Sequence, residues 1–164
     1  MIIRATAEDI STIQFIAKES WKTTYSNILG QEQIDYMLEL MYSKATLLEH
    51  LNNSNYHYFL INEEGKSLGF IGFEINYEEK TTKLHRIYFL TEARGKGLGK
   101  KAIEFITNEI QKIANNRIIL TVNKNNQAKN FYEKLGFKVY DEAIFDIGNG
   151  YVMDDYLMEL VLDK

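Results

Sequence analysis

The chain has 164 residues, 45% hydrophobic and 26% charged, which is enough to bury one compact core. A net charge of −4 argues against a general nucleic-acid or membrane-surface partner. With no cysteine, the chain has no disulfide, thiolate metal site or cysteine nucleophile, and its three histidines lack metal-ligand spacing. No secretory leader or apolar run of membrane length is visible, so we expect a cytoplasmic protein without metal, nucleic acid or membrane partners.

Apolar spacing and turn residues predict the order of elements. The N-terminal part begins with a short strand over residues 1–5, and Thr6 with Asp9 three places later indicates a helix start. Helices are expected to about Trp21 and over 31–41 and 45–51, with 20–30 less regular. Strands then follow over 56–61, 67–75 and 83–90 as an antiparallel meander.

The second half predicts a helix over 98–114, a strand over 117–122, a helix to about Leu135 ended by Gly136, and a hairpin over 137–145 and 151–162. A helix separates the strand before residue 90 from that at 117–122, so we expect these two strands to be parallel neighbours. No linker or repeat is visible. We therefore predict one domain over residues 1–164.

The segment Arg94-Gly95-Lys96-Gly97-Leu98-Gly99-Lys100 joins a strand to a helix. Glycines let the backbone approach a ligand, and the free N–H groups that open a helix favour phosphate oxygens. The spacing fits neither the triphosphate-binding loop nor the dinucleotide fingerprint, because Lys100 occupies the place where each needs glycine. The segment therefore predicts a cradle for another diphosphate ligand. A flexible, solvated turn is the structural alternative.

Two motifs in the right order carry a family resemblance. Arg94-x-x-Gly97-x-Gly99 and the later run Asn125-x-x-Ala128-x-x-x-Tyr132-Glu133-Lys134-Leu135-Gly136-Phe137 resemble the GCN5-related N-acetyltransferase (GNAT) superfamily. The ending from Phe145 to Met158 is similar to PaiA-like acetyltransferases. The layout matches over the whole chain, and the specific motifs lie between about Ile87 and Phe137.

The resemblance implies an α/β (α+β) domain with a mostly antiparallel mixed sheet of six to seven strands. A splayed parallel pair lies at its centre, and about four helices flank it. It also implies acetyl-CoA as donor. The residues implied to bind it are Ile87, Tyr88, Phe89, Arg94, Gly95, Lys96, Gly97, Leu98, Gly99, Lys100, Asn125 and Tyr132.

The resemblance implies Tyr132 as the general acid that protonates the leaving thiolate, and a phenol suits that task. A tyrosine that only packs against the cofactor is the alternative. The acceptor amine must lose a proton before attack, and His85 is the candidate base because strict alternation would place it on the face of Ile87 and Phe89. A half-buried sheet histidine without a catalytic role is equally compatible.

The resemblance also implies an acceptor site between residues 21–31 and the final hairpin loop, where Trp21, Tyr25, Tyr151 and Asp155 are candidate contacts. An acidic, aromatic mouth would suit a polyamine-like primary amine. The alternative for Asp155 is a position in a turn or at a solvated edge, and the alternative for Trp21 is a position in the core.

Three other functions stay open at this point: a protein N-terminal or lysine acetyltransferase, a CoA-binding sensor without turnover, and a nucleotide-binding protein. An apolar C-terminal strand could also pair in a homodimer.

Overall fold

The computed structural model describes residues 1–162, so the last two residues of the predicted 1–164 domain lie outside the described part. The first half contains β1 (Ile2–Arg4), α1 (Ile10–Tyr25), α2 (Gln31–Tyr42), α3 (Lys44–Leu51), β2 (Tyr56–Glu63), β3 (Lys66–Glu78) and β4 (Thr81–Phe89). The second half contains α4 (Leu98–Gln111), β5 (Arg117–Asn123), α5 (Ala128–Lys134), β6 (Lys138–Gly148) and β7 (Tyr151–Val161). Short 3-10 turns, Ala7–Asp9 and Thr91–Ala93, precede α1 and the loop before α4. Within residues 1–162, no helix is both long and apolar enough to cross a bilayer.

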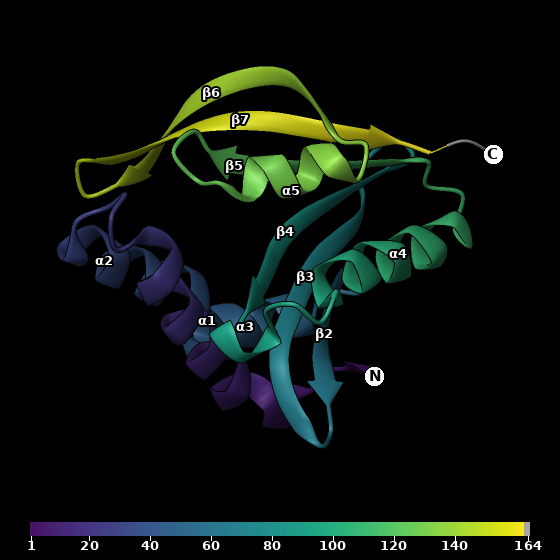
Figure 1. Ribbon diagram of the computed structural model, residues 1–164, viewed down its shortest axis with the longest axis horizontal. Helices are drawn as coiled ribbons and strands as arrows, with labels where there is room; N and C mark the ends of the chain where they lie inside the picture. Colours follow the sequence, from purple (N-terminus) through teal and green to yellow (C-terminus); the bar gives the residue numbers. More distant parts are fainter. Residues whose placement is uncertain (163–164) are drawn as a thin grey trace.

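The strands form one mixed sheet in the order β1-β2-β3-β4-β5-β7-β6. Every pairing is antiparallel except that of β4 with β5, which confirms the predicted parallel pair. That pairing covers only Thr81–Lys83 against Arg117–Ile119, earlier along β4 than the segment predicted to pair. Beyond these residues the two strands diverge, and the sheet opens into two arms like a V (Figure 1).

Asn115 fixes the closed end of the V, because the residue is 2% exposed and its side chain makes three hydrogen bonds. Its Oδ1 accepts from the Thr82 hydroxyl at 2.7 Å and from the Asn76 backbone N–H, and its Nδ2 donates to Asn76 Oδ1 at 2.8 Å. A buried polar side chain with several hydrogen bonds holds one geometry. The loop before β5 is therefore tied to β3 and β4.

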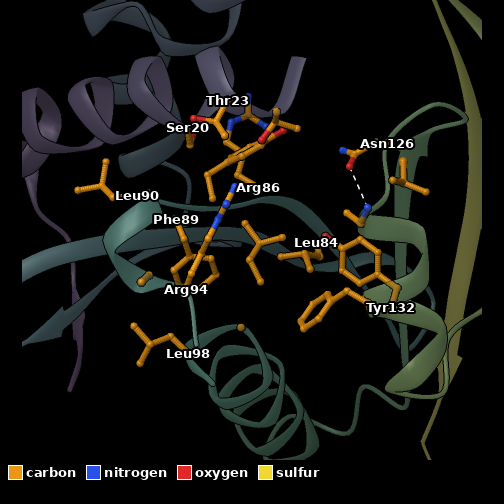
Figure 2. A pocket seen from close by; sticks show the side chains of 18 of the residues that line it. Ser20, Thr23, Leu84, Arg86, Phe89, Leu90, Arg94, Leu98, Asn126 and Tyr132 are labelled. Carbon is orange, nitrogen blue, oxygen red and sulfur yellow. Dashed lines mark hydrogen bonds between the residues drawn. The ribbon is translucent and has the colours of Figure 1, made fainter. Parts of the chain in front are cut away.

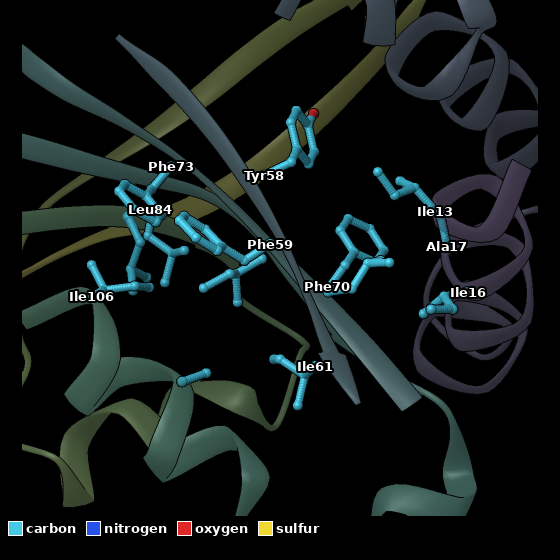
Figure 3. Close-up of a cluster of buried hydrophobic side chains, with 14 of the residues drawn as sticks. Ile13, Ile16, Ala17, Tyr58, Phe59, Ile61, Phe70, Phe73, Leu84 and Ile106 are labelled. Atoms are coloured by element: carbon cyan, nitrogen blue, oxygen red, sulfur yellow. The ribbon is translucent and has the colours of Figure 1, made fainter. Parts of the chain in front are cut away.

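Helices cover both faces of the first arm. Tyr58 and Phe70 point to the side where α1 packs through Ile13 and Ala17, as Figure 3 shows. Phe59 points to the opposite side, where its ring lies 4.8 Å from that of Phe105 on α4. This alternation follows from the period of two along a strand, and each fully buried large side chain contributes about 2–3 kcal/mol.

A β-bulge interrupts the pairing of β3 with β4. Gly72 pairs with Arg86 while Phe73 pairs with Leu84, so His85 is the extra residue. The bulge places His85 and Arg86 on the same face, that of α1–α3. The prediction that His85 shares a face with Ile87 and Phe89 is therefore wrong, because it assumed strict alternation through position 85.

Helix ends differ from the predictions in two places. The predicted capping box forms, with Asp9 Oδ2 accepting from the Thr6 N–H at 2.8 Å. The helix it introduces continues to Tyr25, past the predicted irregular segment, because Tyr25 packs four residues after Trp21 with ring centroids 4.6 Å apart. The second difference is in α4, which ends at Gln111, three residues earlier than predicted.

Candidate active site

A cavity of about 500 Å³ lies between the two arms of the sheet. Its walls come from the end of α1, the second half of β4, the loop before α4, the middle of β5 and the start of α5 (Figure 2). These are the segments that the divergence of β4 from β5 leaves apart. The cavity is thus a direct product of the short parallel pairing.

The loop into α4 forms one end of the cavity. Gly95 and Gly97 adopt left-handed conformations, with φ of 77° and 68°. Within residues 1–162, no backbone acceptor pairs with the N–H groups of residues 95 and 97–100, and the first bond of the helix runs from the Lys101 N–H to the Gly97 carbonyl. Several free donors and the positive end of a 14-residue helix dipole therefore meet at one point. This arrangement fits a diphosphate.

The inner edge of β4 forms the wall between the loop and the closed end. β3 occupies its other edge, and β5 leaves it after Lys83. From Leu84 to Phe89 the backbone groups that face β5 therefore have no strand partner. An extended polar chain could pair with them as a strand would.

Tyr132 projects from α5 into the cavity (Figure 2). Its ring contacts Phe131 and Phe137 at centroid distances of 5.3 and 5.5 Å. Burial, together with the nearby Tyr88 phenol, raises the pKa of Tyr132 above its ordinary value of 10. The hydroxyl therefore keeps its proton at neutral pH.

Most residues predicted to bind the cofactor line this cavity. They are Ile87, Tyr88, Phe89, Arg94, Gly95, Gly97, Leu98, Gly99, Lys100 and Tyr132. Lys96 and Asn125 do not line it, and both are exposed. Asn126 lines it instead, while its Oδ1 accepts from the Ala128 N–H at 2.9 Å. The Asn123 side chain accepts from the Asn125 N–H and turns the chain, so the position after the predicted one faces the cavity.

Of the residues predicted to contact the acceptor, only Tyr25 lines the cavity, and its hydroxyl lies 3.4 Å from that of Tyr88. Trp21 is 1% exposed and packs against the rings of Tyr25 and Tyr88, in agreement with the alternative that it is a core residue. The Tyr151 ring lies 5.5 Å from that of Tyr36 in a tilted arrangement, and Tyr151 does not line the cavity. Asp155 lies inside β7 and is 7% exposed, so the alternative of a solvated edge is wrong for it.

His85 borders the cavity but is engaged elsewhere. Its ring stacks on Tyr56 at 4.9 Å, and Nε2–H donates to Glu74 Oε1 at 3.0 Å. Burial lowers the pKa of His85 below its ordinary value, and the charges of Lys83 and Arg86 lower it further. An imidazole with a lowered pKa binds a proton weakly at neutral pH, which weakens its case as a general base.

Sequence reasoning missed several lining residues. Arg86 is the most notable, because it is a charged side chain that is only 8% exposed. Its signal in the sequence was an arginine inside an apolar strand. Ser20, Thr23 and Thr24 also line the cavity, and the last two do so because α1 runs one turn further than predicted.

The fold and the cavity define a class of enzyme. The model of the acetyltransferase (GNAT) family matches residues 15–137, which is well over half of the chain. The chain belongs to this family and is an N-acetyltransferase of the GNAT type.

Individual relatives cover nearly the whole chain. A spermidine N(1)-acetyltransferase from Thermoplasma acidophilum is 30% identical over 162 residues, covering 93% of this chain and 94% of the relative. A 5-NmdU N-acetyltransferase from Pseudomonas phage PaMx11 is 31% identical over 146 residues, covering 88% and 91%. The crystal structure of the PaiA N-acetyltransferase from Thermoplasma acidophilum with coenzyme A superposes with a TM-score of 0.84 at 28% identity, covering 98% of both chains.

Proposed function

We propose that this protein transfers the acetyl group of acetyl-CoA to the primary amine of a small cationic metabolite, by direct attack in a ternary complex. The observation that carries the proposal is the single cavity that joins the phosphate cradle, the unpaired edge of β4 and the Tyr132 hydroxyl. Without cysteine the chain offers no thiol to carry the acetyl group. Transfer in one step between two bound substrates fits that composition.

The cradle suits the diphosphate of CoA. The N–H groups of residues 95 and 97–100 would donate to its oxygens, with Arg94 and Lys100 adding positive charge beside them. The pantetheine arm carries amides and would pair with the free edge of β4 from Leu84 to Phe89. Both regions fit acetyl-CoA in chemistry, and the PaiA relative of similar fold was crystallised with coenzyme A.

The same edge of β4 suits the reacting carbonyl. A backbone N–H near Phe89 would stabilise the oxyanion that develops during attack, and losing such a donor typically costs about 3–4 kcal/mol. Tyr132 would then donate its proton to the departing thiolate, because its raised pKa keeps the phenol protonated until a strong base appears beside it.

The acceptor is proposed to be polyamine-like. Support comes from the relative named as a spermidine acetyltransferase and from aromatic and acidic groups near the cavity, including Tyr25 and Asp155. Deprotonation of the amine by His85 stays a prediction. Given the engagement of His85 with Glu74, loss of the proton to water is the stronger proposal. The cytoplasmic location and the homodimer also stay predictions.

A free-thiol release assay with acetyl-CoA and a panel of amines tests the function. We expect turnover with small cationic amines and none with neutral alcohols. Activity on peptides alone would favour a protein N-terminal or lysine acetyltransferase. Tight binding of CoA by calorimetry without turnover on any amine would favour a sensor, and tighter binding of ATP than of CoA would refute the assignment of the cradle.

A further inference from the structure

Arg86 is a buried charge without a counter-charge. Its side chain lies on β4 beside the bulge and reaches into the cavity (Figure 2). The guanidinium carbon lies 5.2 Å from the centroid of the Tyr42 ring. Within residues 1–162, no carboxylate lies within ion-pair distance, and Nε is sealed from solvent without an acceptor. An unpaired charge at this depth is costly, and a cation–π contact offsets only part of that cost.

The surroundings of Arg86 are also short of partners. The Tyr42 and Tyr56 hydroxyls are buried and unbonded, so three polar groups in one cluster lack partners. Glu74, on the neighbouring strand, bonds to His85 instead. Native proteins rarely leave such groups unsatisfied unless a ligand completes them. The terminal nitrogens of a guanidinium form a planar fork that matches two anionic oxygens.

A charge of opposite sign lies on the other arm of the sheet. Asp155 on β7 pairs in register with Asn123, is 7% exposed, and has an unbonded, sealed Oδ1. The Tyr88 phenol is affected by both charges. Burial raises the pKa of Tyr88 most, and the hydrogen bond with Tyr25 lowers it. The positive charge of Arg86 lowers this pKa further, and the negative charge of Asp155 raises it. Both charges therefore lie close enough to the Tyr88 phenol to affect its pKa.

We propose that Arg86 binds a carboxylate on the acceptor, so that the acceptor is an amino acid with a reactive primary amine and not a simple polyamine. This rests on the proposed amine acetylation. Within the class of small cationic amines, it replaces the polyamine-like acceptor of the proposed function with a diamino acid. Asp155 does not line the cavity, and its negative charge favours the ammonium end of the same molecule through space. A diamino acid carries both groups and remains a small cationic metabolite. A polyamine offers nothing to Arg86 and brings positive charge toward it.

Matched acceptors test the proposal, since lysine and ornithine differ from cadaverine and putrescine only by the α-carboxylate. For the unmodified enzyme we expect kcat/KM at least about tenfold higher for each amino acid than for its diamine, because a site built for a polar group rejects the analogue that lacks it. Equal or better turnover of the diamines would overturn the proposal.

Two variants, Arg86→Gln and Arg86→Lys, test whether Arg86 is the source of the preference for amino acids over diamines. Arg86→Gln should bring the ratio of amino acid to diamine to about one or below, and Arg86→Lys should keep part of it, since lysine retains the charge and loses the fork. An unchanged ratio in Arg86→Gln would overturn the assignment of Arg86. The melting temperature of free Arg86→Gln should equal or exceed that of the unmodified protein, because an uncompensated charge is removed. A marked fall would indicate a structural role in holding the tyrosines.

Failure of this inference differs from failure of the proposed function. If the enzyme releases thiol with diamines but ignores the carboxylate, amine acetylation stands and the Arg86 subsite falls. If no amine in either series is acetylated while CoA binds, the proposed function itself falls.

Discussion

Replacing Tyr132 with phenylalanine tests the acid in the proposed mechanism. The hydroxyl has no hydrogen-bond partner within residues 1–162, and the ring contacts with Phe131 and Phe137 do not involve it. The substitution should therefore leave packing intact, with a melting temperature within about 2 °C of the unmodified protein, since surface and unpaired groups change stability little.

The kinetic effect should fall on the chemical step. General acid catalysis contributes about 10²–10⁴-fold, so we expect kcat to fall at least about 100-fold, equal to about 2.7 kcal/mol of transition-state stabilisation. KM for acetyl-CoA should change by less than about twofold, because the cradle and the β4 edge stay in place. Thiol release under saturating acetyl-CoA measures both parameters.

Two comparisons sharpen this test. Tyr77→Phe removes a hydroxyl from an exposed tyrosine outside the cavity and should leave kcat unchanged. An acetyl thioester with a more acidic leaving thiol needs less help from an acid, so the defect of Tyr132→Phe should shrink with it. A kcat within about threefold of the unmodified enzyme, or an effect on KM alone, would show that Tyr132 only packs against the cofactor.

Three further predictions give distinct readouts. Gly97→Ala adds a Cβ to a residue with φ of 68°, at a place where no other atom lies within 4 Å. Backbone strain of about 1–2 kcal/mol should lower the melting temperature by several degrees, and the distorted loop should raise KM for acetyl-CoA. The control Gly65→Ala, with φ of 80° in a turn outside the cavity, should lower the melting temperature without changing KM. Burial, with the charge of Asp154, raises the pKa of Asp155 from 3.8 to about 6, so the folded state binds the extra proton. Urea unfolding should then show the unmodified protein gaining stability relative to Asp155→Asn as pH falls from about 7 to 4, and a gap independent of pH would refute the shift. His85→Gln keeps a donor for Glu74 and should preserve kcat/KM and its pH profile, whereas a 100-fold loss with a vanished acidic limb would restore His85 as the base.

The order of strands and helices around the glycine loop could be predicted from the sequence. Apolar residues repeat every 2 residues in strands and every 3.6 in helices, and these repeats and the two motifs depend only on residues near one another in the chain. The Thr6 cap and the turn at Gly136 were predicted for the same reason. The bulge at His85 depends on the register in which β3 pairs with β4, and no residue type in either strand indicates its position. One extra residue there reversed the predicted face of His85 relative to Ile87 and Phe89.

The substrate side was predicted less well than the cofactor side. Cofactor contacts come mainly from backbone groups in one continuous loop and strand, which a motif can mark. Acceptor contacts come from side chains on separate elements whose meeting depends on packing. Trp21 illustrates the difference, since its aromatic ring suits a binding site by type, yet tertiary packing places it under Tyr25 and Tyr88.

The free edge of β4 has a consequence for the life of the protein between reactions. From Leu84 to Phe89 an interior strand is left half-paired, with no proline and with the buried Arg86 as its one arginine or lysine, so it has little of the protection found at natural sheet edges. While acetyl-CoA or CoA is bound, we expect that edge to be covered. A cell depleted of both would hold the protein with an open template for strand addition, so its solubility should follow the supply of the molecule that it consumes.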